Sequence, residues 1–202
     1  MTVKVKICGL KDVETALFAA ASGAEAIGLV FAKSPRRVEV DRARAICAAL
    51  PPFVGRVGVF ADEEQVAVRE IADVCGLTVL QFHGAEDAAY CAGFTLPILK
   101  AVRVQAAGDL AKLLPFPASG FVLDTYHPLL AGGTGRTFDW SLLAGRPEVP
   151  VILAGGLTPE NVAVAIRQVR PYAVDVSSGV ESEGRKDLQK IKAFIKATRM
   201  CD

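Results

Sequence analysis

The chain has 202 residues, of which 51% are hydrophobic and 22% charged, and its 23 Lys and Arg residues against 22 Asp and Glu give a formal net charge of +1. These values exclude a mainly disordered chain and argue against a dedicated nucleic-acid surface or an acidic tail. No apolar run approaches the ~18 residues of a membrane span, and residues 1–10 show no secretory signal. The five cysteines are an odd number without a C-x-x-C pair, which favours free thiols and a cytoplasmic location.

Short β-branched runs alternate with amphipathic helical stretches along the whole chain. The runs predict strands at residues 3–8, 26–31, 56–60, 79–83, 98–102, 120–124, 151–154 and 173–176. The stretches predict helices at residues 13–22, 42–50, 64–75, 87–92, 140–143, 160–169 and 187–198, with the weakest helical pattern at 105–114.

Strands that alternate with helices imply a parallel sheet, either open and doubly wound or closed. Closure into a (β/α)8 TIM barrel accounts for all eight predicted strands and removes the two edges of an open sheet. No Pro/Gly/Ser-rich linker divides the chain. We therefore expect an α/β fold with one barrel domain over residues 1–202, in which the fifth helix is weak or missing.

Catalytic groups of such a barrel lie at the C-terminal ends of the strands and in the loops that follow. Side chains of a strand alternate between its two faces. The side chains that this alternation directs into the barrel are Lys4, Lys6, Cys8, Gln81, His83, Lys100, Asp124, Asp175 and Ser177. Since the first and eighth strands are neighbours in a closed barrel, we expect Lys6 and Asp175 to pair below the floor of the site.

Two glycine-containing loops follow the last two strands. Gly155 and Gly156 come after the seventh strand, and Ser178 and Gly179 come after the eighth. Loops at these two places of a barrel commonly bind phosphate through backbone N–H groups and a short helix N-terminus. The pair of loops predicts a phosphate site, although tight turns alone would also account for the glycines.

Cys8 and Asp124 are the candidate reacting groups. Cys8 ends the first strand above Lys6, and a neighbouring cation favours a thiolate over a thiol. The alternative for Cys8 is an inert buried thiol. Asp124 ends the sixth strand and precedes a long loop instead of a helix, which suits a general acid better than a helix cap. The two side chains could face each other across the barrel mouth.

Three further positions are candidate ligand-binding residues. Arg36 and its neighbour Arg37 follow the second strand and could together clamp an anion, unless they are a solvated charge run. Gly133 lies in the glycine-rich segment 131–140, which predicts either a mobile loop over a ligand or a solvated turn. His83 ends the fourth strand, where a structural histidine is the alternative to a binding residue.

In this order, the residues resemble those of the phosphoribosylanthranilate isomerase family over nearly the whole chain. The resemblance is carried by KICG at 6–9, SPR at 34–36, VGVF at 57–60, QFHG at 81–84, LDT at 123–125, GTGRTFDW at 133–140, AGGLTPENV at 154–162 and DVSSGVE at 175–181. Two positions depart from it, because Phe82 stands where leucine is common and Arg136 where lysine is common.

The resemblance implies a barrel enzyme of tryptophan biosynthesis that uses no cofactor and no metal. Its reaction would be the Amadori rearrangement of N-(5-phosphoribosyl)anthranilate to 1-(2-carboxyphenylamino)-1-deoxyribulose 5-phosphate. By the same resemblance Cys8 is the general base, Asp124 the general acid and Arg36 the partner of the anthranilate carboxylate. The implied partner is a phosphorylated small molecule, with neither nucleic acid nor membrane, bound by a monomer or a homodimer.

Two other classes of protein would share the phosphate loops. One is a sugar-phosphate epimerase or a lyase of the tryptophan synthase α type, which would not require Cys8 opposite Asp124. An epimerase would also use metal ligands, which the two histidines, His83 and His127, provide poorly. The other is a non-catalytic sugar-phosphate binding module.

Overall fold

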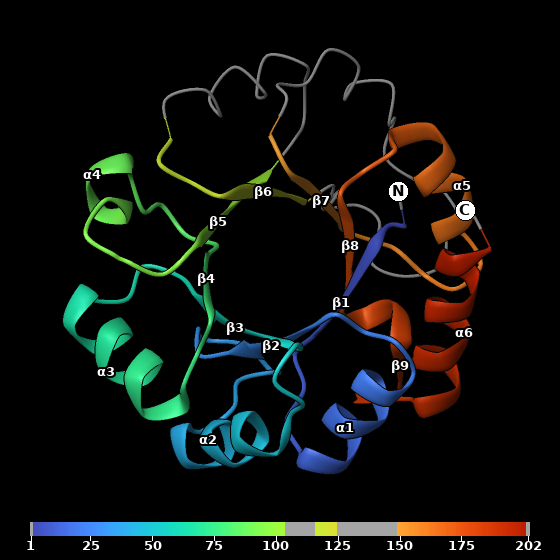
Figure 1. Ribbon diagram of the computed structural model, residues 1–202, viewed down its shortest axis with the longest axis horizontal. Coiled ribbons are helices and arrows are strands. Elements are labelled where there is room, and N and C mark those ends of the chain that lie inside the picture. The colour runs from blue at the N-terminus through green and yellow to red at the C-terminus, as the bar shows by residue number, and fades with distance from the viewer. Residues whose placement is uncertain (1, 104–115, 125–148, 201–202) are drawn as a thin grey trace.

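The computed structural model describes residues 2–103, 116–124 and 149–200. Eight parallel strands close into a barrel, and helices surround it (Figure 1). The strands are β1 (Lys4–Cys8), β2 (Ala26–Val30), β3 (Gly55–Phe60), β4 (Val79–Phe82), β5 (Ile98–Arg103), β6 (Gly120–Asp124), β7 (Val151–Ala154) and β8 (Ala173–Val176). The predicted (β/α)8 barrel is confirmed, and each predicted strand agrees with its observed bounds within one residue at either end.

The helices on the outside of the barrel are α1 (Val13–Ala21), α2 (Val40–Ala49), α3 (Gln65–Cys75), α4 (Ala88–Cys91), α5 (Val162–Val169) and α6 (Leu188–Arg199). Aspartates begin several of them: Asp12 accepts a hydrogen bond from the Thr15 N–H, and Asp187 accepts from two amides of α6. The predicted helices at 105–114 and 140–143 lie outside the described residues, as does Gly133. Among the described residues, no helix is both long enough and apolar enough to cross a membrane.

A short structure that the sequence did not predict follows β8. A 3-10 turn, η3 (Ser178–Val180), leads into the two-stranded hairpin β9 (Glu181–Ser182) and β10 (Arg185–Lys186). The antiparallel register of this hairpin places Lys186 opposite Glu181. These two charged residues therefore lie side by side just beyond the end of β8.

Apolar packing separates the two faces of the sheet. The larger core lies between strands and helices, where Phe82 of β4 stacks edge-on against Tyr90 of α4 at 5.3 Å between ring centroids. A small cluster fills the barrel interior, and it includes Val122 of β6 and Ile152 of β7. Since Val122 and Asp124 share one face of β6, the parity that directs Asp124 inward is confirmed.

The predicted inward direction of Lys100 is wrong. Lys100 pairs in register with Phe82, whose ring faces the helices, so Lys100 also faces outward. Its ammonium group donates to the Gly84 carbonyl at 2.7 Å and to Glu86 Oε2 at 2.8 Å. Alternation along β5 does not by itself show which of its two faces points into the barrel. A lysine is stable on the outer face here because the buried carboxylate of Glu86 lies there to pair with it.

The chain ends meet across the closing seam between β1 and β8. Arg199, at the end of α6, donates to the Val3 carbonyl at 2.6 Å and to the Gly23 carbonyl at 2.8 Å. The same guanidinium group lies 2.7 Å from Glu25, which also accepts from the Val5 N–H. The last helix is thus tied to the first strand by hydrogen bonds.

Candidate active site

Cys8 lies at the C-terminal end of β1, and 8% of its surface is exposed. The Ser177 hydroxyl donates to the Cys8 carbonyl at 3.1 Å, which joins the end of β1 to the end of β8. Across the other neighbour, a Cβ at Gly28 of β2 would come within 2.6 Å of the Cys8 sulfur. Glycine at position 28 therefore makes the space that the thiol occupies.

The predicted ion pair beneath Cys8 is confirmed. Lys6 Nζ lies 2.8 Å from Asp175 Oδ2, and the side chains are 4% and 8% exposed. The register of the barrel seam places Lys6 directly opposite Asp175. The two opposite charges cancel, and the pair lies beneath Cys8 at the bottom of the barrel mouth.

Burial raises the pKa of the Cys8 thiol, although Lys6 and Lys186 act in the opposite direction. Lys6 favours the thiolate as expected, but burial outweighs it, so the net shift of the Cys8 pKa is upward. Lys6 is already paired with Asp175, whose negative charge also raises the Cys8 pKa. Burial thus disfavours the thiolate of Cys8, whereas a further positive charge close to the sulfur would favour it.

Replacing Lys6 by methionine should destabilise the protein by about 3–5 kcal/mol, because Asp175 would stay buried without its partner. The double variant Lys6→Met/Asp175→Leu should regain part of this loss, since it removes the unpaired charge. Urea unfolding of the two variants and the wild type measures both changes. A Lys6→Met protein as stable as the wild type would contradict the structural importance of this pair.

Asp124 ends β6 with its carboxylate pointing into the mouth and 20% of the side chain exposed. His83, which follows β4, places Nε2 at 3.3 Å from Asp124 Oδ2. The other ring nitrogen of His83 lies 3.5 Å from the amide nitrogen of Gln81. His83 thus contacts Asp124, the candidate general acid, and the alternation of side chains along the strands does not by itself predict this contact. Between β6 and β1 stand only β7 and β8, so Cys8 and Asp124 belong to the same mouth of the barrel.

Arg36 is held by Glu181, a residue that the sequence analysis did not single out. Arg36 Nε and Nη2 donate to the two carboxylate oxygens of Glu181, each at 2.7 Å. Burial raises the pKa of Glu181, but hydrogen bonds from Arg36 and Lys186 outweigh it and lower that pKa to about 2. The predicted clamp of adjacent arginines is wrong, because Arg37 lies instead at 4.0 Å from Glu39.

The two predicted phosphate loops meet at one place. Gly155 and Gly156 have positive φ values of 84° and 64°, a backbone region that favours glycine. A Cβ on Gly179 would overlap the carbonyl of Leu157, so the loop after β8 packs directly on the loop after β7. Ser178 and Gly179 lie in the turn η3, beside this contact. The amides of both loops can therefore serve one anion.

Glu86 organises the neighbouring part of the rim, and it too was missed in the sequence. Its buried carboxylate accepts from the Asp62 N–H at 2.8 Å and from the Gly84 N–H at 2.9 Å, and it pairs with Lys100. These contacts join the loops after β3 and β4, the second of which carries His83. Within the described ranges, no group of three or more His, Cys, Asp or Glu residues could hold a metal ion.

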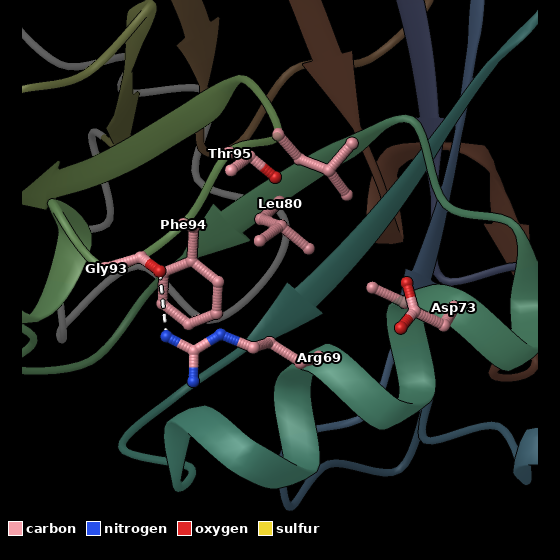
Figure 2. Close-up of a pocket in the computed structure, with 8 residues that line it drawn as sticks. Arg69, Asp73, Leu80, Gly93, Phe94 and Thr95 are labelled. Atoms are coloured by element: carbon pink, nitrogen blue, oxygen red, sulfur yellow. Dashed lines mark hydrogen bonds between the residues drawn. The ribbon is translucent and has the colours of Figure 1, made fainter.

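A cavity of about 270 Å³ lies elsewhere, on the outside of the barrel (Figure 2). Its walls come from α3, β4 and the segment before β5. Arg69 spans it by donating to the Gly93 carbonyl at 2.8 Å and by lying 5.1 Å from the Phe94 ring centroid. None of the candidate residues lines this cavity, so it is separate from the site at the barrel mouth.

Known proteins resemble this chain in both sequence and fold. Residues 5–197 match the family described as N-(5'phosphoribosyl)anthranilate (PRA) isomerase. The chain is 57% identical over 201 residues to the N-(5'-phosphoribosyl)anthranilate isomerase of Pseudomonas fluorescens, covering 98% of this chain and 96% of the relative.

Two solved structures resemble the barrel closely. The phosphoribosyl anthranilate isomerase of Thermotoga maritima superposes with a TM-score of 0.89 at 44% identity, covering 98% of this chain and 99% of the other. A second phosphoribosyl anthranilate isomerase, solved in complex with reduced 1-(o-carboxyphenylamino)-1-deoxyribulose 5-phosphate, has a TM-score of 0.86 at 42% identity, with 98% and 99% of the chains covered.

Proposed function

The chain belongs to the N-(5′-phosphoribosyl)anthranilate isomerase family, and we propose that Cys8 and Asp124 are the acid–base pair of its reaction. The protein is an enzyme of tryptophan biosynthesis that isomerises N-(5-phosphoribosyl)anthranilate to 1-(2-carboxyphenylamino)-1-deoxyribulose 5-phosphate. The observation that supports the proposed pair is its placement. Cys8 and Asp124 end β1 and β6 at the mouth of the barrel, where catalytic groups of this fold lie.

Ring opening is the first step and requires an acid. The carboxyl group of Asp124, in its protonated form, donates to the furanose oxygen as the C1′–O bond breaks. The nitrogen lone pair of the substrate supplies the electrons, and a Schiff-base cation results. Because the Schiff-base cation then accepts the electrons of the C2′–H bond, we propose that the enzyme needs neither a cofactor nor a metal. His83, 3.3 Å from Asp124, holds the carboxyl group in position at the rim.

Proton transfer from C2′ is the second step and requires a base. The Schiff-base cation acidifies the C2′ proton, and its positive charge also favours the thiolate of Cys8. The thiolate removes the proton and gives an enolamine, which tautomerises to the ketone. The raised pKa of the free thiol fits this order, since the cation that lowers it forms during the reaction. Each proton-transfer group contributes ~10²–10⁴-fold to the rate.

Phosphate and carboxylate anchors position the substrate. We assign the phosphate to the loops of Gly155, Gly156, Ser178 and Gly179, which pack on each other at the end of β7 and β8. Gly133 lies outside the described residues, and we propose it as a substrate contact because its glycine-rich segment predicts a loop over the ligand. Anchoring through non-reacting groups supplies the orientation that the two proton transfers need.

Replacing Arg36 by alanine should weaken substrate analogues that carry the aromatic carboxylate by roughly 10–100-fold, because a charged hydrogen-bond partner is lost. Analogues that lack the carboxylate should bind almost unchanged. Calorimetry with both kinds of analogue measures the difference, and Arg37→Ala, which removes the more exposed neighbour, is the control. Equal weakening of both kinds would place Arg36 away from the carboxylate.

The activity itself is tested by mixing the protein with N-(5-phosphoribosyl)anthranilate and following the decay of anthranilate fluorescence. A decay that depends on enzyme concentration supports isomerisation, whereas a binding module would leave the fluorescence constant after mixing. We further propose one domain over residues 1–202, either a monomer or a homodimer, with the phosphorylated small molecule as its partner. The four free cysteines of the described residues support a reducing, cytoplasmic location.

A further inference from the structure

Three charged side chains form a chain of ion pairs beside Cys8. Arg36 comes from the loop after β2, Glu181 from β9 and Lys186 from β10. Lys186 Nζ lies 2.7 Å from Glu181 Oε1, the same oxygen that accepts from Arg36 Nε. The exposed fraction of the side chain falls from 33% for Arg36 to 9% for Glu181 and 7% for Lys186. Only Arg36 is therefore open to a ligand.

Glu181 fixes which edge of the Arg36 guanidinium remains available. It accepts from Nε and from one N–H of Nη2, so both N–H groups of Nη1 and the second N–H of Nη2 stay outside this pairing. These remaining groups form a second fork that suits a bidentate carboxylate. Gly9 supports the orientation, because a Cβ there would come within 2.8 Å of Arg36 Cδ.

An arginine that is paired with a carboxylate attracts a second carboxylate poorly, because the pair is neutral. Lys186 changes this balance, since two cations and one anion leave the cluster with a charge of +1. The other charged pair near Cys8, Lys6 with Asp175, is neutral and adds nothing to the net charge. The cluster therefore contributes a net positive charge at this side of the mouth.

Lys186 is fixed in a position from which it reaches Glu181. Its ammonium group donates to the Ser177 carbonyl at 3.0 Å and lies 3.2 Å from the Ser177 hydroxyl. The β9–β10 register holds it opposite Glu181. Burial lowers the pKa of Lys186 while Glu181 raises it, so the paired carboxylate supports the charged form.

We propose that Lys186 is a specificity-determining positioning residue, which neutralises Glu181 so that Arg36 presents net positive charge and a free N–H fork to the substrate's aromatic carboxylate. The proposal rests on the role of Arg36 proposed above. Lys186 does not touch the ligand, and it acts by offsetting the negative charge of Glu181.

The test compares two ligands on the full-length enzyme. One is the reduced product, 1-(2-carboxyphenylamino)-1-deoxyribitol 5-phosphate, and the other is its phenylamino counterpart without the carboxylate. The ratio of their dissociation constants gives the carboxylate preference, and loss of packing or of phosphate binding would weaken both ligands alike. Lys186→Met should lower this preference about tenfold, because the cluster loses its net charge.

The double variant Glu181→Gln/Lys186→Met restores a charge of +1 and should recover most of the preference. Lys190→Met is the matched control, because Lys190 donates only to the Glu181 backbone carbonyl, at 2.8 Å, and its loss should leave the preference unchanged. Should Lys186→Met alone fail to fold, the double variant is compared with Glu181→Gln. In that background, removal of Lys186 lowers the charge of the cluster from +2 to +1 and should also lower the preference about tenfold.

Two results would overturn the proposal. A Lys186→Met enzyme with the wild-type preference would show that the charge of Lys186 is not felt at Arg36. A preference that stays tenfold low in the double variant, or one that removal of Lys186 leaves unchanged in the Glu181→Gln background, would show that the charge of the cluster does not set the preference. Failure of the Arg36 assignment is distinct, because Arg36→Ala itself would then leave the preference intact. Failure of the isomerase activity would appear separately, in the fluorescence assay of the wild type.

Discussion

Replacing Cys8 by serine should lower kcat by ~10²–10⁴-fold, the usual contribution of a general base. A serine hydroxyl is far harder to deprotonate than a thiol, so the base is lost while the shape of the side chain is nearly kept. The hydrogen bond from Ser177 to the backbone carbonyl of residue 8 does not depend on the sulfur and should survive. We therefore expect nearly unchanged phosphate affinity and an unchanged unfolding midpoint, measured beside steady-state kinetics.

Cys47→Ser makes the same atomic change at a buried thiol of α2, away from the barrel mouth. Because Cys47 lies on a helix outside the barrel, its thiol cannot reach the substrate, and kcat should be kept. Burial raises the pKa of Cys47 to about 11. In the wild type, kcat/KM should increase with pH as the Cys8 thiolate forms, because burial raises the pKa of that thiol. In the Lys6→Met variant, this rise of kcat/KM should occur at higher pH, since the substitution removes a cation that lowers the pKa of Cys8. Wild-type turnover by Cys8→Ser would refute the assignment.

Replacing Asp124 by asparagine should lower kcat by at least ~10²-fold with little change in KM. The amide keeps the volume of the carboxyl group and its contact with His83, but it cannot protonate the furanose oxygen. Rapid-mixing fluorescence with excess enzyme measures the chemical step directly.

Asp62→Asn is a suitable control for this variant. Asp62 also lies at the rim, after β3, where its carboxylate accepts from the Ala85 N–H at 2.6 Å. Its φ of 56° is a conformation that asparagine tolerates well, so the backbone should stay in place. If Asp124→Asn raises KM and keeps kcat, Asp124 binds the substrate and another group is the acid.

Local sequence patterns were sufficient to predict the barrel and its reacting ends. Periodicity predicts the strands, and parity together with barrel closure predicts Lys6 opposite Asp175, as the register of the seam confirms. The same argument predicts the places of Cys8 and Asp124. The C-terminal end of a strand lies at the barrel mouth, and parity decides whether the side chain there points into the barrel.

The partners of the rim residues could not be predicted in this way. Glu181 reaches Arg36 across 145 positions of sequence, through loops whose conformations no periodicity defines. Lys186 depends on a hairpin with strands of two residues each, too short for an alternating pattern. For Lys100, the face was misjudged because its partner Glu86 lies in a loop that no strand pattern describes. Glu181 is visible in the sequence as the charged last residue of the DVSSGVE segment, but only the tertiary structure shows that its partner is Arg36.

The tie between Arg199 and Val3 has a consequence for how the chain is made. The seam that closes the barrel joins residues that are 169 positions apart, so it forms only after β8 has been synthesised. Until then the growing sheet keeps two open edges, which can pair with other chains. Arg199 follows β8 in the sequence, so it links α6 to the first strand after the seam residues have been made. Because Val3 and Arg199 lie together, a circularly permuted gene that joins the start of β1 to the end of α6 and opens a surface loop elsewhere would encode the same closed sheet in a different order of synthesis.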